Sequence, residues 1–149
     1  TAKFEFSSYA GFNNTVDFYK VLDAEGTIKS GDKLLKPGDA GYAKAAVESS
    51  INLKLTRDNK SVDASLMEGS IFAPYLIANG TADQFLKSNG DNNPGSAPVA
   101  YFNYLGANPD KVDHVRSLGD NLFTFEDLPV NSGIPADFED VIVKATLGV

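Results

Sequence analysis

The chain contains no cysteine and no tryptophan, and only one histidine and one methionine among its 149 residues. Without cysteine it has no disulfide, no thiolate metal site and no thiol nucleophile. Without tryptophan it lacks the side chain best suited to stacking on sugar rings, which weakens a lectin interpretation. The single histidine, His114, stands in no nucleophile motif, so we expect a structural or surface residue rather than a member of a catalytic triad.

Positive charge is also scarce, because 13 basic residues against 20 acidic ones give a formal net charge of -7. Such a charge repels phosphate backbones and anionic lipids, so we expect no nucleic-acid partner and no membrane insertion. No apolar run approaches the roughly 20 residues of a membrane-spanning helix, and the N-terminus lacks the residue order of a signal peptide. We expect one soluble, monomeric domain over residues 1–149, cut from a larger protein.

Apolar runs rich in β-branched and aromatic residues recur at short spacing and indicate strands. The runs cover residues 2–6, 15–21, 51–55, 70–78, 99–105, 121–126 and 138–147. Segments rich in Gly, Asn, Asp and Pro separate them, as is typical of turns. A helix is expected over 40–48 with Asp39 as N-cap, and a helical turn over 81–86 capped by Thr81. We therefore predict a mainly all-β fold, an antiparallel β-sandwich or jelly roll with one or two short helices.

Acidic residues concentrate in the last third of the chain. Eight of the 20 acids lie between residues 108 and 140, where they alternate with apolar strand residues. Calcium takes about six to eight oxygen ligands from carboxylates, amides, carbonyls and water. No EF-hand loop is present, so loops distant in the sequence would have to assemble a site. The candidate calcium ligands are Asn108, Asp110, Asp113, Glu126, Asp127, Asp137 and Asp140.

Two other interpretations of this acidic segment are open. Acids can lie on a solvated face and never converge, which is the simpler interpretation of any charge cluster. A pair such as Glu126 with Asp127, or Asp137 with Asp140, would suit a glycosidase, but the chain is short and we expect no enzyme. Carboxylates that did converge would repel one another without a cation, so convergence itself would favour a bound ion.

Several segments carry a resemblance to a known family. They read YFNYLGANPD at 101–110, VDHV at 112–115, FEDL at 125–128 and DFEDVIV at 137–143, with FNNTVDFYKV at 12–21, PGDAGY at 37–42 and APYLIA at 73–78. In these segments the chain resembles a family of uncharacterised function found in bacterial secreted proteins, including cyanobacterial surface proteins and calcium-dependent repeats-in-toxin (RTX) adhesins. The last strand of that family usually carries D-x-D-[FY]-x-D, whereas Pro135 stands here in place of its first aspartate, so one expected ligand is missing.

The resemblance implies a calcium-dependent binding domain of a secreted or cell-surface bacterial adhesin. It also implies a peptide or cell-surface protein ligand, captured by its C-terminal carboxylate through calcium, since a partly coordinated cation attracts an anion. The ligand-binding candidates are Asp91, Asn92 and Asn93 in the loop 88–97, and Tyr104. That loop reads equally well as an ordinary solvated loop. The alternatives are a calcium-rigidified spacer, a calcium-dependent glycan binder and an intracellular acidic domain without metal.

Overall fold

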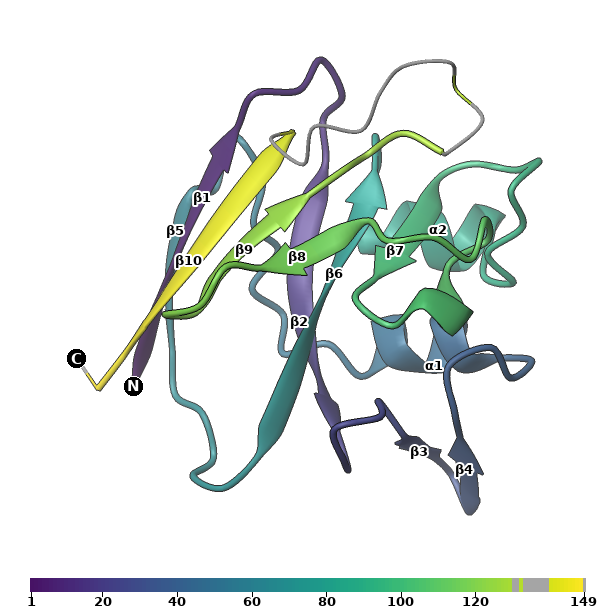
Figure 1. The fold of residues 1–149 in the computed structure, drawn as a ribbon, viewed down its shortest axis with the longest axis horizontal. Helices are drawn as coiled ribbons and strands as arrows, with labels where there is room; N and C mark the ends of the chain where they lie inside the picture. The colour runs from purple at the N-terminus through teal and green to yellow at the C-terminus, as the bar shows by residue number, and fades with distance from the viewer. Residues whose placement is uncertain (130–131, 133–139, 149) are drawn as a thin grey trace.

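The computed structural model describes residues 1–129, 132 and 140–148, and these form ten strands, two short α helices and one 3-10 turn (Figure 1). The strands are β1 (Ala2–Ser8), β2 (Thr15–Val21), β3 (Ile28–Ser30), β4 (Lys33–Leu35), β5 (Ser61–Ala64), β6 (Ile71–Ala78), β7 (Val99–Phe102), β8 (Val115–Ser117), β9 (Leu122–Phe125) and β10 (Val141–Leu147). The helices are α1 (Tyr42–Glu48), α2 (Ala82–Ser88) and the 3-10 turn η1 (Leu105–Ala107). No helix in this described part is long and apolar enough to span a membrane.

The strands form two main antiparallel sheets. One has the order β5-β1-β10-β9-β8 and the other the order β2-β6-β7, while β3 and β4 form a separate hairpin. The two main sheets pack face to face, and α1 and α2 lie against the outer face of the three-stranded sheet (Figure 1). The predicted fold class is therefore confirmed: the protein is a mainly β sandwich with two short helices, and it is not a closed barrel.

Side-chain alternation explains how the layers pack. In β1 the residues Ala2, Phe4 and Phe6 are buried, whereas Lys3 and Glu5 are exposed. Because successive side chains of a strand point to opposite faces, the five-stranded sheet buries one face and leaves the other in solvent. Its buried face contributes to the core between the two sheets.

The three-stranded sheet is buried on both faces. In β2, Val16 and Phe18 face the five-stranded sheet, while Tyr19 and Val21 pack with the helices. Two covered faces remove the alternation that a half-exposed strand shows, so β2 reads as a nearly continuous buried run.

The predicted strand over 51–55 is wrong, because left-handed residues interrupt it and only Leu55 makes an isolated bridge, to Val16. Asn52 and Lys54 have φ of 64° and 51°, in the left-handed region. The buried carboxylate of Asp17, on β2, accepts hydrogen bonds from the backbone N–H groups of Leu53 at 3.1 Å and Lys54 at 3.2 Å. A side chain from a neighbouring strand thus satisfies backbone donors that a regular strand would have paired itself.

Within the described residues the remaining boundaries follow the predictions with local differences, while residues 138 and 139 of the predicted strand 138–147 lie outside that part. Helix α1 begins after Gly41, not at a cap formed by Asp39, whose carboxylate instead accepts a bond from the N–H of Lys36. Helix α2 has the predicted Thr81 cap, completed by Gln84 as a capping box. The predicted strand 99–105 ends at 102 and is followed by η1, and the short strands β3, β4, β5 and β8 were not predicted.

Candidate metal centre

Three of the predicted ligands converge where β9 ends and β10 begins. Glu126 and Asp127 directly follow β9, and Asp140 directly precedes β10. The two strands pair with Val141 opposite Phe125, so the three acids meet at one end of this ladder. One carboxylate oxygen from each lies within 4.8 Å of the others. We call Glu126, Asp127 and Asp140 the acidic cluster; the first two are buried and the third is half-buried.

Amide donors orient each carboxylate of the acidic cluster. The backbone N–H of Asp127 donates to Asp140 Oδ2 at 3.0 Å, and the N–H of Leu128 donates to Glu126 Oε1 at 3.4 Å. The side-chain amide of Asn14 donates to Asp127 Oδ2 at 2.8 Å. The cluster therefore joins two parts of the chain, and Asn14 supports it from a third.

The pKa values of the two aspartates in the acidic cluster shift in opposite directions. Burial raises the pKa of Asp127 to about 6, and the neighbouring Asp140 adds to this rise against the opposing bond from Asn14. Burial also raises the pKa of Asp140, but hydrogen bonds from Glu126 and Asp127 outweigh it, so its pKa lies below the usual value. Within the described residues, no lysine or arginine forms an ion pair with Asp127 or Asp140.

The chemistry of these donors fits a hard cation. The acidic cluster offers only carboxylate oxygens, which suit Ca²⁺ or Mg²⁺, whereas zinc and copper sites draw on imidazole or thiolate. Calcium also tolerates ligands drawn from several loops, with carbonyls and water completing its shell of about six to eight oxygens. Glu126, Asp127 and Asp140 are thus suited to supply part of a calcium shell.

His114 is buried and contacts the backbone of the acidic cluster. Its Nδ1 is 2.9 Å from the carbonyl oxygen of Glu126, and its Nε2 is 2.7 Å from Asp110 Oδ2. The carbonyl of Glu126 can only accept, so Nδ1 carries the hydrogen of that bond. The ring stacks on Tyr101 with centroids 3.7 Å apart. Asp110 therefore pairs with His114, away from the acidic cluster.

Two predicted site asparagines act instead at the free edge of β7. Asn108 accepts from the N–H of Phe102 at 2.6 Å and donates to its carbonyl at 3.1 Å. Asn92 accepts from the N–H of Ala100 and donates to its carbonyl, both at 2.9 Å. Each amide thus pairs with a residue of β7 as a neighbouring strand would, and both side chains are buried.

The other predicted site residues lie apart from the acidic cluster. Asp113 is exposed and pairs with Arg116 at 3.3 Å, and Tyr104 covers Gly26. Asp91 and Asn93 are exposed in the loop before β7. Asp137 and the replaced position Pro135 lie outside the described residues.

Sequence reasoning missed Asn14, which contacts the acidic cluster from the loop between β1 and β2. Its amide is buried and lies 113 positions from Asp127 in the sequence. The available signal was a polar residue directly before a strongly apolar strand, which indicates a turn and carries no information about a partner so far away.

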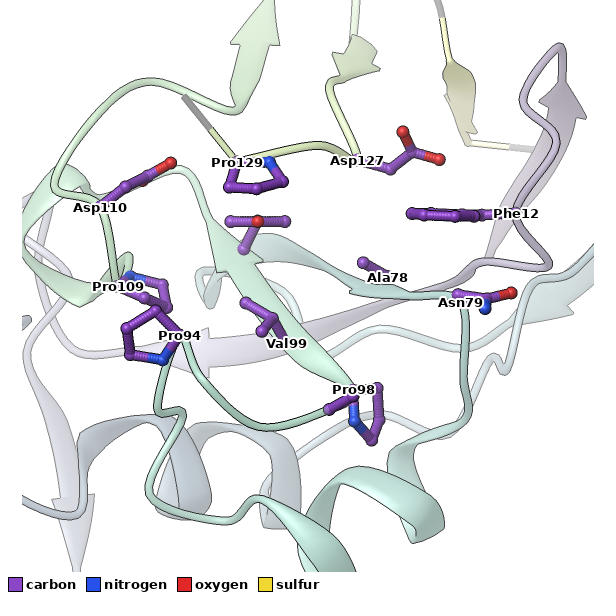
Figure 2. A pocket seen from close by; sticks show the side chains of 12 residues that line it. Phe12, Ala78, Asn79, Pro94, Pro98, Val99, Pro109, Asp110, Asp127 and Pro129 are labelled. Atoms are coloured by element: carbon purple, nitrogen blue, oxygen red, sulfur yellow. The ribbon is translucent and has the colours of Figure 1, made fainter. Parts of the chain in front are cut away.

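A groove of ≈ 620 Å³ lies beside the acidic cluster, and Asp127 belongs to both (Figure 2). Most of its lining is apolar and includes four prolines, Pro94, Pro98, Pro109 and Pro129, with Val99 and Tyr101 of β7. Figure 2 shows Asp127 and Phe12 toward one end, and Asp110 toward the other. This volume is in the range of about 300 to 1,000 Å³ that ligand pockets span.

Comparison with known proteins places the chain in a family. No curated protein and no solved structure matches it. A family described as a domain of unknown function (DUF4114) matches residues 66–148, which is more than half of the chain and includes the whole acidic cluster. The chain therefore belongs to this family of domains of unknown function.

Proposed function

We propose that this domain is a calcium-dependent binding module that holds a peptide or protein ligand in the groove beside the acidic cluster. The observation that carries the proposal is the sharing of Asp127 between the cluster and the groove. An ion held by Asp127 would stand at one end of an apolar groove. There its remaining positive charge attracts an anionic ligand group, such as a C-terminal carboxylate, while the groove takes an apolar side chain.

The pairing of Asp110 with His114 supports this arrangement. Asp110 lines the groove, and its Oδ2 lies 2.7 Å from His114 Nε2. With calcium on the acidic cluster, the ion compensates the charge of Asp127, and the carboxylate of Asp110 is engaged by the imidazole of His114. Such a groove accepts an anionic chain end despite the formal net charge of -7.

The apolar lining favours a peptide over a glycan. Four proline rings, Val99 and Tyr101 provide few hydrogen-bonding groups for sugar hydroxyls. The edge of β7 is closed to an added strand at Ala100 and Phe102, because Asn92 and Asn108 occupy the outward backbone groups of these residues. The ligand is therefore held by its end and side chains rather than by strand addition.

Binding is proposed rather than catalysis. One carboxylate oxygen from each of the three acids lies within 4.8 Å of the others, an arrangement that suits joint ligation of one ion. Together with the resemblance to domains of calcium-dependent adhesins, this favours a module of a secreted or cell-surface bacterial adhesin.

Thermal unfolding with calcium, magnesium or chelator tests the ion. Calcium at about 100 times its Kd stabilises a one-site protein by about 2.7 kcal/mol, which raises the Tm of a domain of this size by roughly 5 to 10 °C. We expect this shift for the wild type and for Asp113→Asn, an exposed acid outside the cluster, and its loss in Asp140→Asn. An equal Tm in calcium and in chelator contradicts the proposal.

A peptide screen then tests the groove. Random peptides with free or amidated C-termini are presented to the calcium-loaded protein, and we expect selective capture of the free ends. Phe12→Ala, at the groove, should weaken capture, while Tyr9→Ala, an exposed aromatic of the same loop outside the groove, should not. Calcium stabilisation without capture of any peptide would identify the rival function, a calcium-rigidified spacer.

A further inference from the structure

The loop between β1 and β2 reaches the acidic cluster through one buried side chain, Asn14. Its Nδ2 donates to Asp127 Oδ2 at 2.8 Å, and its Oδ1 accepts from the backbone N–H of Asn79 at 2.8 Å. The N–H of Asn79 can only donate, so it requires the oxygen on its side and directs the NH₂ group toward Asp127. The orientation of the amide is thereby set by the backbone of another strand end.

Asn79 connects this amide to the groove. It directly follows β6, adopts the left-handed backbone conformation with φ of 53°, and lines the groove beside Ala78. Its own side chain accepts from the N–H of Asn13 at 3.1 Å. The hydroxyl of Thr15 donates to the carbonyl of Gly80 at 2.7 Å, so the start of β2 and the end of β6 are tied at three points.

From this geometry we propose that Asn14 is a positioning residue of the calcium site, and that it transmits ion binding to the groove through the backbone of Asn79. The inference rests on the proposed function. Asn14 holds one oxygen of Asp127 and so directs that carboxylate toward its place in the acidic cluster, as outer-shell donors do around protein metal sites. Any movement of Asp127 on binding the ion acts on the amide of Asn14, and this amide is bonded to the groove at Asn79.

Calcium itself is the probe for this inference, measured by calorimetry and by ¹H–¹⁵N NMR. In the wild type we expect the side-chain amide signal of Asn14 and the backbone amide signal of Asn79 to shift together as calcium saturates the site. In Asn14→Ala we expect calcium affinity to fall by roughly tenfold or more, the size of effect that outer-shell changes produce. The Asn79 signal should then no longer follow the ion.

Two control variants separate positioning from general destabilisation. Thr15→Val removes a buried hydrogen bond of the same junction without touching Asp127, and Asn13→Ala changes the neighbouring asparagine, whose side chain accepts from Arg57. Both should keep wild-type calcium affinity. The role of Asn14 is refuted if Asn14→Ala binds calcium as tightly as Thr15→Val. It is also refuted if calcium binds to the wild type without shifting the two amide signals. In both cases the proposed calcium binding itself stands. A wild type that binds no calcium overturns the proposed function and this inference with it.

Discussion

Removing the charge of Asp127 should stabilise the protein without calcium and make it less stable than the wild type with calcium. Asp127→Asn keeps the size of the side chain and a carbonyl oxygen for the amide of Asn14, but it removes a buried negative charge beside Asp140. The difference between the ordinary pKa of 3.8 and the value of about 6 corresponds to about 3 kcal/mol against the ionised form. Burial of the Asp127 carboxylate is the largest cause of this penalty, and repulsion from Asp140 adds to it. Because water screens part of both effects, we expect the variant without calcium to gain about 1 to 2 kcal/mol at pH 7.5.

The same charge should make the stability of the wild type depend on pH. The folded-state pKa of Asp127 lies above its unfolded value of 3.8, so protonation favours folding. This stabilisation is complete below pH 3.8 and is lost as the pH rises through about 6. The wild type in chelator should therefore lose stability between pH 4 and 7, and Asp127→Asn should lack this slope. The lowered pKa of Asp140 acts in the other direction, at and below pH 3.8, outside this window.

Urea unfolding in chelator and in calcium, from pH 4.5 to 8, measures both effects. With calcium the order should reverse, because only the wild type gains the stabilisation of the bound ion. Asp113→Asn is the control, since this exposed acid pairs with Arg116 and should change neither the slope nor the calcium response. A variant at position 127 that is less stable than the wild type in chelator at pH 7.5, or that calcium stabilises equally, would refute the reasoning.

Two further predictions concern residues that support the site. Asn108→Ala leaves buried backbone groups of β7 without their partner. Urea unfolding should therefore show a free energy of unfolding lower by about 2 to 3 kcal/mol, with an unchanged calcium response. A decrease of less than about 0.5 kcal/mol would contradict the edge-capping role. Gly26→Ala places a methyl group 2.6 Å from the ring of Tyr104 at φ of 88°, whereas Gly31→Ala meets open space at φ of 60°. Melting curves should therefore show a larger loss for the first variant than for the second, by about 1 to 3 kcal/mol, and equal losses would show that backbone strain dominates over contact.

Much of the fold was predictable because its signals are local. The alternation in β1, the apolar run of β2 and the Thr81 cap of α2 each depend on residues within a few positions. The prediction of a strand over 51–55 failed because the conformation of this segment depends on Asp17, more than 30 positions away. Apolar content indicated a strand there, but a buried carboxylate decided where the backbone donors point.

For the candidate site, too, some features were predictable from the sequence and others depended on the tertiary structure. The sequence by itself determined the chemistry, a cysteine-free chain whose carboxylates gather in one segment beside apolar strands. Only the tertiary structure decided which of them meet: the pairing of β9 with β10 joins Glu126 and Asp127 to Asp140, while Asn108 closes a strand edge. The reason is that composition sets which ligands are available, whereas convergence depends on strand register and on distant donors such as Asn14, which no local pattern encodes.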